Sequence, residues 1–197
     1  MKRIVERFKQ INMPLKSFIG LEFFAREGNW QTLSYGHYLK ELYLWEMEQK
    51  FEKNLRSNFP KGKITIGNSY EIANNLSFKN KFDLIVFDNP QGIYGDYCEH
   101  FDALPLTPFL CKEKSIIIFN VNKNPFDYDD YPNWKMRRKS YYGKNAENLS
   151  SEFILNFYKS LFNSIGFAVQ DCFEEKRNDQ YLSYLIFFLK KNIFLDK

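Results

Sequence analysis

The sequence contains few of the residues that build disulfide frameworks and metal centres. Its 197 residues include three cysteines and two histidines. The cysteines are odd in number and none belongs to a Cys-x-x-Cys pair, which argues against a disulfide framework and the common zinc motifs. The two histidines lie too far apart in sequence for an ordinary zinc site. We therefore expect no bound metal, and reduced, mostly buried thiols at Cys98, Cys111 and Cys172.

Long hydrophobic runs are also absent. The longest, Tyr181–Leu189, is well short of the roughly 20 residues that a helix needs to cross a bilayer. The stretch Met1–Phe8 is interrupted by charge and lacks the apolar core of a signal peptide. These absences argue against membrane insertion and secretion, and they favour a cytoplasmic location.

Apolar and aromatic residues are plentiful, at 44% and 19% of the chain. This content excludes a wholly disordered protein and is sufficient for one domain with a sizeable core. The net charge of +4 is mildly basic and compatible with a polyanionic partner. An AT-rich coding sequence explains the many Lys, Asn, Ile and Phe residues equally well.

Apolar runs alternate with stretches of helical periodicity along the chain. We expect strands at 18–24, 41–45, 63–66, 82–87, 115–121, 167–173 and 181–189, and helices at 31–39, 47–59, 71–76 and 150–165. This alternation predicts an α/β fold with a doubly wound, mostly parallel seven-stranded sheet. The short polar connection 174–180 predicts that the last two strands form an antiparallel hairpin. No linker is visible, so residues 1–197 are expected to form a single domain.

Two helical stretches have a recognisable apolar face. In the basic N-terminal extension, residues 1–16, this face is formed by Ile4, Phe8 and Ile11. In the stretch 47–59 it is formed by Met47, Phe51, Leu55 and Phe59. We favour the interpretation that the extension is a helix covering one face of the sheet, with a lid or substrate arm as the alternative.

Acidic residues follow three of the expected strands. Glu22, Glu46 and Asp88 come at the ends of the first, second and fourth strands, and a short loop leads from Glu22 to Gly28. In a doubly wound sheet these strand ends lie side by side along the crevice where ligands bind. A carboxylate after the second strand can accept both hydroxyls of a ribose, and Gly28 permits a close backbone approach. The sequence therefore predicts a nucleoside-cofactor site. Read singly, Glu22 and Glu46 are each more often a surface or helix-capping residue.

These residues resemble the motifs of the class I S-adenosylmethionine-dependent methyltransferases. Glu22, Phe24, Ala25 and Gly28 match the first motif in its (Asp/Glu)-x-Phe-Ala-Gly-x-Gly form, and the stretch 88–91 is similar to the fourth motif. The resemblance implies a Rossmann-like methyltransferase fold with S-adenosylmethionine as cofactor. It further implies a ribose-binding role for Glu46 and an adenine-contacting loop at Asn68 and Ser69, with Asp88, Asn89 and Pro90 as catalytic residues.

Two residues depart from the family pattern. Arg26 stands where the first motif usually has glycine, and Gln91 replaces the aromatic residue of the fourth motif. These departures keep open a non-catalytic binding subunit that retains the methyltransferase fold. No Pro-Cys pair follows the fourth strand, so the covalent mechanism of cytosine-C5 enzymes is not expected.

The segment 123–148 is too long for a plain connection, and we interpret it as a substrate-side insertion. It begins acidic and aromatic and then becomes basic, with Trp134, Arg137 and Arg138 in its second half. Interleaved aromatic and cationic side chains suit a nucleic-acid strand. A solvated loop or a lid is an equally good interpretation. Tyr94, in the glycine-containing stretch 91–97, is a further candidate for substrate binding.

The function that the sequence favours is methyl transfer from S-adenosylmethionine to RNA or DNA. A small-molecule or protein methyltransferase is the alternative that keeps the cofactor and drops the nucleic acid. Neither the oligomeric state nor the methylated atom can be read from the residues.

Overall fold

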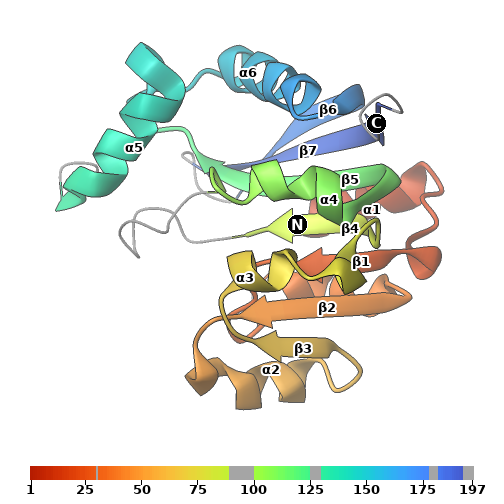
Figure 1. Cartoon of the computed structure of the whole chain (residues 1–197). Coiled ribbons are helices and arrows are strands. Elements are labelled where there is room, and N and C mark those ends of the chain that lie inside the picture. The colour runs from red at the N-terminus through yellow and green to blue at the C-terminus, as the bar shows by residue number, and fades with distance from the viewer. Residues whose placement is uncertain (30, 89–99, 125–129, 178–181, 193–197) are drawn as a thin grey trace.

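The computed structural model describes residues 1–29, 31–88, 100–124, 130–177 and 182–192. Its centre is a seven-stranded sheet with the order β3-β2-β1-β4-β5-β7-β6 (Figure 1). The strands are β1 (Ile19–Glu22), β2 (Glu41–Glu46), β3 (Lys63–Ile66), β4 (Phe82–Phe87), β5 (Cys111–Asn122), β6 (Phe167–Lys176) and β7 (Leu182–Lys191).

The topology confirms the doubly wound sheet predicted from the sequence. Strands β1 to β5 run parallel, and β7 is antiparallel to both β5 and β6. The chain moves outward from β1 to β3 and then returns to the other side of β1 at β4. The carboxyl ends of β1 and β4 therefore flank the point where the strand order reverses, which is where open α/β sheets bind ligands.

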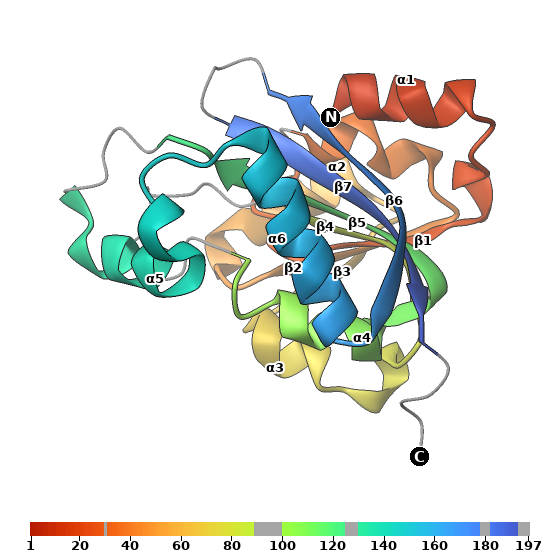
Figure 2. The same ribbon diagram turned by 90° about the horizontal axis from the view of Figure 1, so that it is seen from above.

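Helices cover both faces of this sheet, as Figure 2 shows from above. One face carries α1 (Lys2–Gln10) and α2 (Glu52–Asn58), and the other carries α3 (Ser69–Ala73), α4 (Thr107–Leu110) and α6 (Ser151–Ser164). Successive strand residues point to opposite faces, so Leu84 packs in the core under α1 while Ile85 packs in the core under α6. The apolar runs of the central strands thus supply two cores at once.

Helix α1 packs against the last two strands. Ile4, Val5 and Phe8 are buried, and the Phe8 ring meets Phe188 edge-on with a centroid distance of 5.9 Å. The expectation for Ile11 was wrong: the helix ends at Gln10, and the Ile11 side chain is 54% exposed.

The helix expected at 31–39 is absent. This stretch forms two 3₁₀ turns, Thr32–Ser34 and Gly36–Tyr38. A Cβ at Gly36 would lie 2.8 Å from Leu42 and from Phe59, so the backbone passes too close to these side chains for a regular helix with side chains on this face. The connection therefore forms two 3₁₀ turns, which allow its backbone to pass close to these side chains.

The stretch 47–59 was predicted correctly in its second half only. Phe51, Leu55 and Phe59 are buried as expected, but Met47 is 61% exposed. The chain leaves β2 through a bend and a 3₁₀ turn, Gln49–Phe51, before α2 begins at Glu52. Met47 therefore precedes the helix and does not share its apolar stripe.

The segment 123–148 contains a helix that was not predicted. Helix α5 (Pro132–Tyr142) has proline in its first turn and ends at Gly143, whose φ of +62° lies in the left-handed region. In Figure 1 it lies beside the edge at which β1 to β4 end. The helix after it begins where expected, because the Ser150 hydroxyl accepts a hydrogen bond from the Phe153 amide at 3.1 Å.

Candidate functional site

A small pocket, open to solvent, lies at the carboxyl end of β1. One wall is the loop that follows β1, and the opposite wall is formed by Asp88, after β4, and Arg177, after β6. Its position is the reversal point of the strand order, which the sequence predicted as the ligand site. The lining residues are Glu22, Phe24, Ala25, Arg26, Glu27, Gly28, Asn29, Gln31, Thr32, Asp88 and Arg177.

Gly28 closes the loop on this wall. Its φ is +65°, and a Cβ there would lie 2.7 Å from Phe59 and 2.8 Å from Leu55. The glycine is thus required by its backbone conformation and by the close approach of α2. The sequence predicted a close approach of the backbone to a ligand, whereas the side of Gly28 that must remain bare faces the protein core.

Arg26 has a backbone conformation that favours glycine. Its φ is +46°, in the left-handed region, where a non-glycine residue costs about 1–2 kcal/mol. The guanidinium lies over the Phe51 ring, 5.1 Å from the ring centroid. The loop therefore keeps a glycine-like path although its side chain is large.

Glu46 fastens the same loop to the end of β2. Its carboxylate accepts hydrogen bonds of 2.7 Å from the Arg26 amide at Oε2 and from the Glu48 amide at Oε1. The side chain is buried. An acid predicted to bind ribose is thus placed beside the loop, with its oxygens already engaged by backbone amides.

Glu22 is a buried acid at the base of the pocket. Its Oε2 accepts hydrogen bonds from the hydroxyls of Tyr35 and of Thr32, the latter at 3.2 Å, and its Oε1 accepts a long one of 3.4 Å from the Asp88 amide. Burial, with a contribution from the Asp88 carboxylate, raises the pKa of Glu22 to about 8. The group is poised to gain or lose a proton near neutral pH.

Asp88 is held by side chains from the other half of the sheet. Its Oδ1 accepts hydrogen bonds of 3.0 Å from the Asn120 amide and from the Tyr184 hydroxyl, and it lies 3.7 Å from the Arg177 guanidinium. Burial raises the pKa of Asp88, and Arg177 opposes this increase. Two neighbouring carboxylates and the Arg177 guanidinium therefore meet in one small volume.

Asn68 and Ser69 lie at the start of α3, where the chain leaves β3. Asn68 caps this helix by accepting a hydrogen bond of 3.0 Å from the Tyr70 amide. The Ser69 hydroxyl donates a bond of 2.8 Å to the Phe23 carbonyl, which ties the β3 loop to the β1 loop. Phe24 is half-buried and lies against the rings of Phe23 and Tyr70. Both polar residues thus have a structural role whatever ligand they contact.

The expected nucleic-acid contacts of Trp134 and Arg138 need correction. Both side chains are buried, and Arg138 donates two hydrogen bonds, of 3.3 and 2.8 Å, to the Ala146 carbonyl. They lie on the inner side of α5, so they cannot stack on a bound strand in this conformation. Arg137 is half-exposed and forms an ion pair with Asp102.

Some predicted site residues lie outside the described part of the chain. These are Asn89 and Pro90, assigned to catalysis, Tyr94, assigned to substrate binding, and Gln91.

Sequence reasoning missed five residues of the site. Two of them carried a signal, because a polar side chain interrupts an apolar strand at Asn120 and at Tyr184. The others lie in stretches without a motif. The five are Thr32, Tyr35, Asn120, Arg177 and Tyr184.

The described residues include no group of three or more His, Cys, Asp or Glu side chains that could hold a metal ion. Within the same part of the chain, none of the helices combines the length and apolar character that a membrane crossing requires.

The sequence matches no protein-family model and no curated protein sequence. The structure, by contrast, resembles many solved ones. TYW2 of M. jannaschii, solved in complex with AdoMet, has a TM-score of 0.58 at 14% identity, over 98% of this chain and 77% of that chain. A Pyrococcus horikoshii protein with a provisional assignment as an RNA methyltransferase has a TM-score of 0.59 at 14% identity, over 98% of this chain and 84% of that chain.

The Escherichia coli protein YhhF, provisionally assigned as a methyltransferase, is similar as well. Its TM-score is 0.56 at 11% identity, over 98% of this chain and 86% of that chain. At such low identities the likeness establishes the fold alone, and that fold is the Rossmann-like one of the class I methyltransferases.

Proposed function

We propose that this chain is an S-adenosylmethionine-dependent methyltransferase that acts on RNA or DNA. The observation that carries the proposal is the pocket at the strand-order reversal, where Glu22, Asp88 and Arg177 meet beside the loop fastened by Glu46. The fold supports it, because the similar structure of M. jannaschii TYW2 contains AdoMet.

The nucleoside end of the cofactor is assigned to the loop side. Glu46 would accept the ribose hydroxyls, since each carboxylate oxygen has a second lone pair beyond the one that its backbone amide uses. The half-buried Phe24 ring would offer an apolar face beside it, and the start of α3 at Asn68 and Ser69 would border the base.

The amino-acid end is assigned to the charged side of the pocket. An α-amino acid carries an ammonium and a carboxylate, and the pocket supplies both complements. Glu22 would face the ammonium, whose positive charge would favour loss of the Glu22 proton. Arg177 lines the pocket and is 3.7 Å from its present partner, a loose ion pair that can be exchanged for a ligand carboxylate.

The bound cofactor supplies an electrophilic methyl group on a sulfonium. Catalysis by this chain would then rest on positioning the nucleophile in line with that methyl group. Asp88 is the candidate to orient the nucleophile and to accept its proton, because Asn120 and Tyr184 hold its carboxylate in one orientation. Asn89 and Pro90 are proposed to contribute from the same segment.

The nucleic-acid substrate is the finer part of the proposal. It draws support from the similar Pyrococcus horikoshii structure with a provisional RNA methyltransferase assignment. Arg137 on α5 and Tyr94 are the candidate contacts. A small-molecule or protein acceptor keeps the same cofactor site. A non-catalytic subunit is favoured only if the left-handed Arg26 prevents the loop from accepting the cofactor.

Calorimetric titration with S-adenosylmethionine and S-adenosylhomocysteine tests the cofactor site. We expect binding by the wild-type chain and its loss in Glu46→Ala. Glu48→Ala is the matched control, because this neighbouring acid is 39% exposed at its side chain and pairs with Lys50. Thermal unfolding of each variant separates lost binding from lost folding. No binding of either ligand by a folded wild-type chain would overturn the proposal and favour the non-catalytic subunit.

A further inference from the structure

Lysines gather at the edge of the sheet opposite the pocket. This edge is where β1 to β6 begin and β7 ends, and lysines lie at each of these strand ends except the start of β6. We call this group the lysine edge. Its members are Lys16, Lys40, Lys61, Lys63, Lys79, Lys81, Lys112, Lys114, Lys190 and Lys191.

The strand registers place these residues along one line. Lys63 starts β3 opposite Tyr43, while Lys190 and Lys191 at the end of β7 pair with Ala168 and Phe167 at the start of β6. Lys81 joins the same edge because its amide bonds to the Leu110 carbonyl just before β5. With adjacent strands about 4.8 Å apart, seven strands span about 30 Å.

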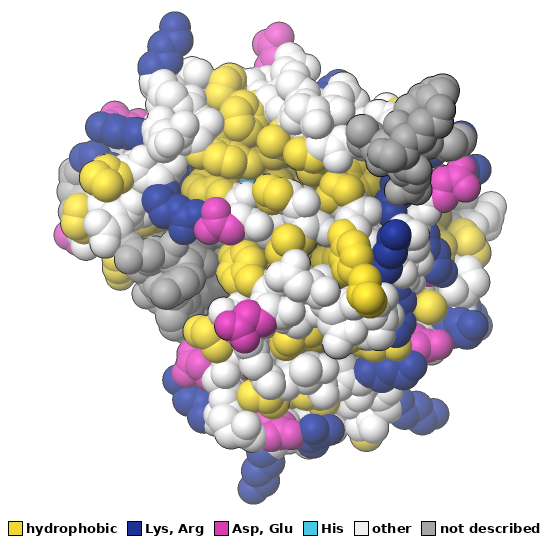
Figure 3. Space-filling model, viewed as in Figure 1, with side chains coloured by type: hydrophobic (Ala, Val, Ile, Leu, Met, Phe, Trp, Pro, Cys, Tyr) yellow, Lys and Arg dark blue, Asp and Glu magenta, His cyan; other side chains and the backbone are white. Residues whose placement is uncertain are grey.

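The charge of the lysine edge exceeds that of the whole chain. Its ten lysines are accompanied by three acids, Glu41, Asp83 and Glu113, which leaves a net charge of +7 on a chain whose total is +4. The remainder of the sequence is therefore net negative. Figure 3 shows Lys and Arg side chains gathered along the right-hand side of the molecule, the side at which β1 to β4 begin in Figure 1.

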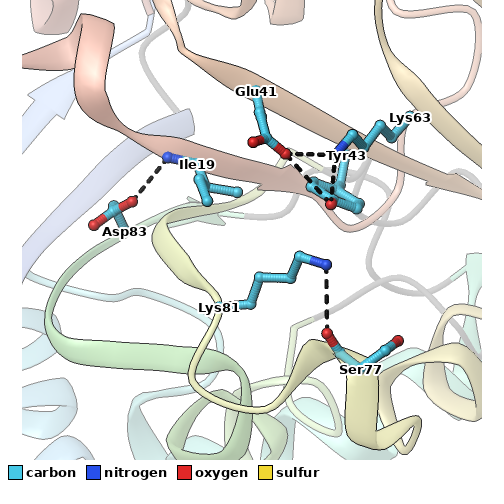
Figure 4. A network of polar contacts seen from close by, with 7 residues as sticks. All are labelled: Ile19, Glu41, Tyr43, Lys63, Ser77, Lys81 and Asp83. Carbon is cyan, nitrogen blue, oxygen red and sulfur yellow. Dashed lines mark hydrogen bonds and ion pairs between the residues drawn. The ribbon is translucent and has the colours of Figure 1, made fainter.

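Aromatic rings and acids hold part of the lysine edge in position, as Figure 4 shows. The Lys63 ammonium donates hydrogen bonds of 2.5 Å to Glu41 and of 3.0 Å to the Tyr43 hydroxyl. The Lys81 ammonium lies 4.6 Å from the centroid of the Tyr43 ring. Lys112 forms an ion pair of 2.7 Å with Asp83.

Other lysines at this edge oppose one another. Lys114 of β5 and Lys190 of β7 are direct cross-strand partners, and like charges in this position destabilise a sheet. Of the two, Lys190 forms an ion pair with Glu113, at 3.8 Å. Packing of the fold does not require these charges, since the lysine edge is exposed or half-exposed throughout.

We propose that the lysine edge binds the phosphate backbone of a nucleic acid. A line of point charges without arginine suits phosphate contacts rather than recognition of bases. A membrane surface fits less well, because only two large apolar side chains in the described connections to this edge are more than half exposed, Ile11 at 54% and Leu76 at 79%. The inference goes beyond the proposed methyl transfer, since this edge lies across the sheet from the pocket.

The test compares two triple variants of equal charge. Lys40, Lys79 and Lys114, all exposed, are changed to Gln in one protein, and the exposed Lys2, Lys53 and Lys159 of α1, α2 and α6 are changed to Gln in the control. Binding of a short fluorescein-labelled RNA duplex is followed by anisotropy as the salt concentration rises. Each lost phosphate contact should reduce the slope of log K against log salt by about 0.9, so a reduction of about 2–3 is expected.

The control variant should keep a slope close to that of the wild type, and both variants should bind S-adenosylhomocysteine as the wild type does. Equal losses in both variants would overturn the proposal, because they would reflect net charge alone. So would an unchanged slope in the lysine-edge variant. If the lysine-edge variant no longer bound anionic vesicles but still bound RNA, this edge would be assigned to a membrane surface instead.

Discussion

The Tyr184 hydroxyl donates a hydrogen bond of 3.0 Å to Oδ1 of Asp88, and so joins the last strand of the chain to the carboxylate that follows β4. Burial and the neighbouring Asp88 carboxylate both raise the pKa of Tyr184, so the tyrosine remains a donor at any ordinary pH. The orientation of the candidate catalytic acid thus depends on a residue that lies 96 positions away in the sequence.

Tyr184→Phe should therefore destabilise the fold and disturb the site. Loss of a hydrogen bond to a charged group costs about 1.5–3 kcal/mol. We expect the free energy of unfolding in urea to fall by about that amount. Tyr38→Phe, at a ring that is 39% exposed, should stay within about 0.5 kcal/mol of the wild type. Equal free energies of unfolding for the two variants would contradict the role given to Tyr184.

Arg177→Gln should weaken one class of ligand selectively. Affinity for S-adenosylhomocysteine should fall at least tenfold, about 1.4 kcal/mol, because the carboxylate of its amino-acid end loses its partner. Affinity for methylthioadenosine, which lacks that end, should not change. Arg56→Gln on α2, an exposed side chain paired with Glu52, is the control. A parallel loss for both ligands would show that Arg177 acts on the pocket as a whole.

Glu22 should make the protein less stable as the pH rises. Its pKa is about 8 in the folded chain against 4.5 for the free group, so its stabilisation is complete below about pH 4.5 and is lost as the pH rises through 8. Across this window the wild type should lose up to about 1.4 kcal/mol per pH unit relative to Glu22→Gln. Urea titrations at a series of pH values measure the difference. Parallel curves of the free energy of unfolding against pH for the two proteins would contradict the raised pKa of Glu22.

His100 should act in the opposite direction. It is buried against the Tyr158 hydroxyl, and burial, with a contribution from Arg138, lowers its pKa from 6.5 to about 3. Its stabilisation is present above pH 6.5 and is lost as the pH falls toward 3. Relative to His100→Gln, the wild type should therefore lose stability on acidification over this window. The comparison uses the slope of the free energy of unfolding against pH, so a pH-independent cost of the substitution does not affect it.

Substitutions at two glycines of similar φ distinguish the energetic cost of a steric clash from the cost of backbone conformation. Gly28 and Gly143 have φ values of +65° and +62°, but a Cβ at Gly28 would collide with Phe59 and Leu55, whereas none of the described atoms lies within 4 Å of a Cβ at Gly143. Gly143→Ala should cost about 1–2 kcal/mol, and Gly28→Ala about 1–3 kcal/mol more. Equal losses in thermal unfolding would mean that α2 can move aside.

The sequence was sufficient for the sheet because most of its strands contain a short apolar run bounded by polar or turn residues. Phe82–Phe87 and Lys63–Ile66 lie where they were expected, and the acids Glu22 and Asp88 follow β1 and β4 in the pocket. The alternation of elements predicted the doubly wound, mostly parallel sheet, and the short polar connection 174–180 predicted the antiparallel hairpin.

The partners of those acids could not be predicted in the same way. Asn120, Tyr184 and Arg177 reach Asp88 only because β5 and β6 end, and β7 begins, at the same edge, a long-range relationship without a local pattern. The same limit explains the errors at Trp134 and Arg138: a pattern of residue types does not tell which side of a helix faces inward.

The Arg26 and Glu48 backbone amides, which donate hydrogen bonds to the Glu46 carboxylate, can report on ligand binding at the loop. A ligand that takes the oxygens of this carboxylate must weaken or share the hydrogen bonds from the Arg26 and Glu48 backbone. Occupancy of the pocket and the chemical shifts of these two amide protons are therefore linked. A nuclear magnetic resonance titration can follow them for any candidate ligand, without a known reaction and without an acceptor substrate.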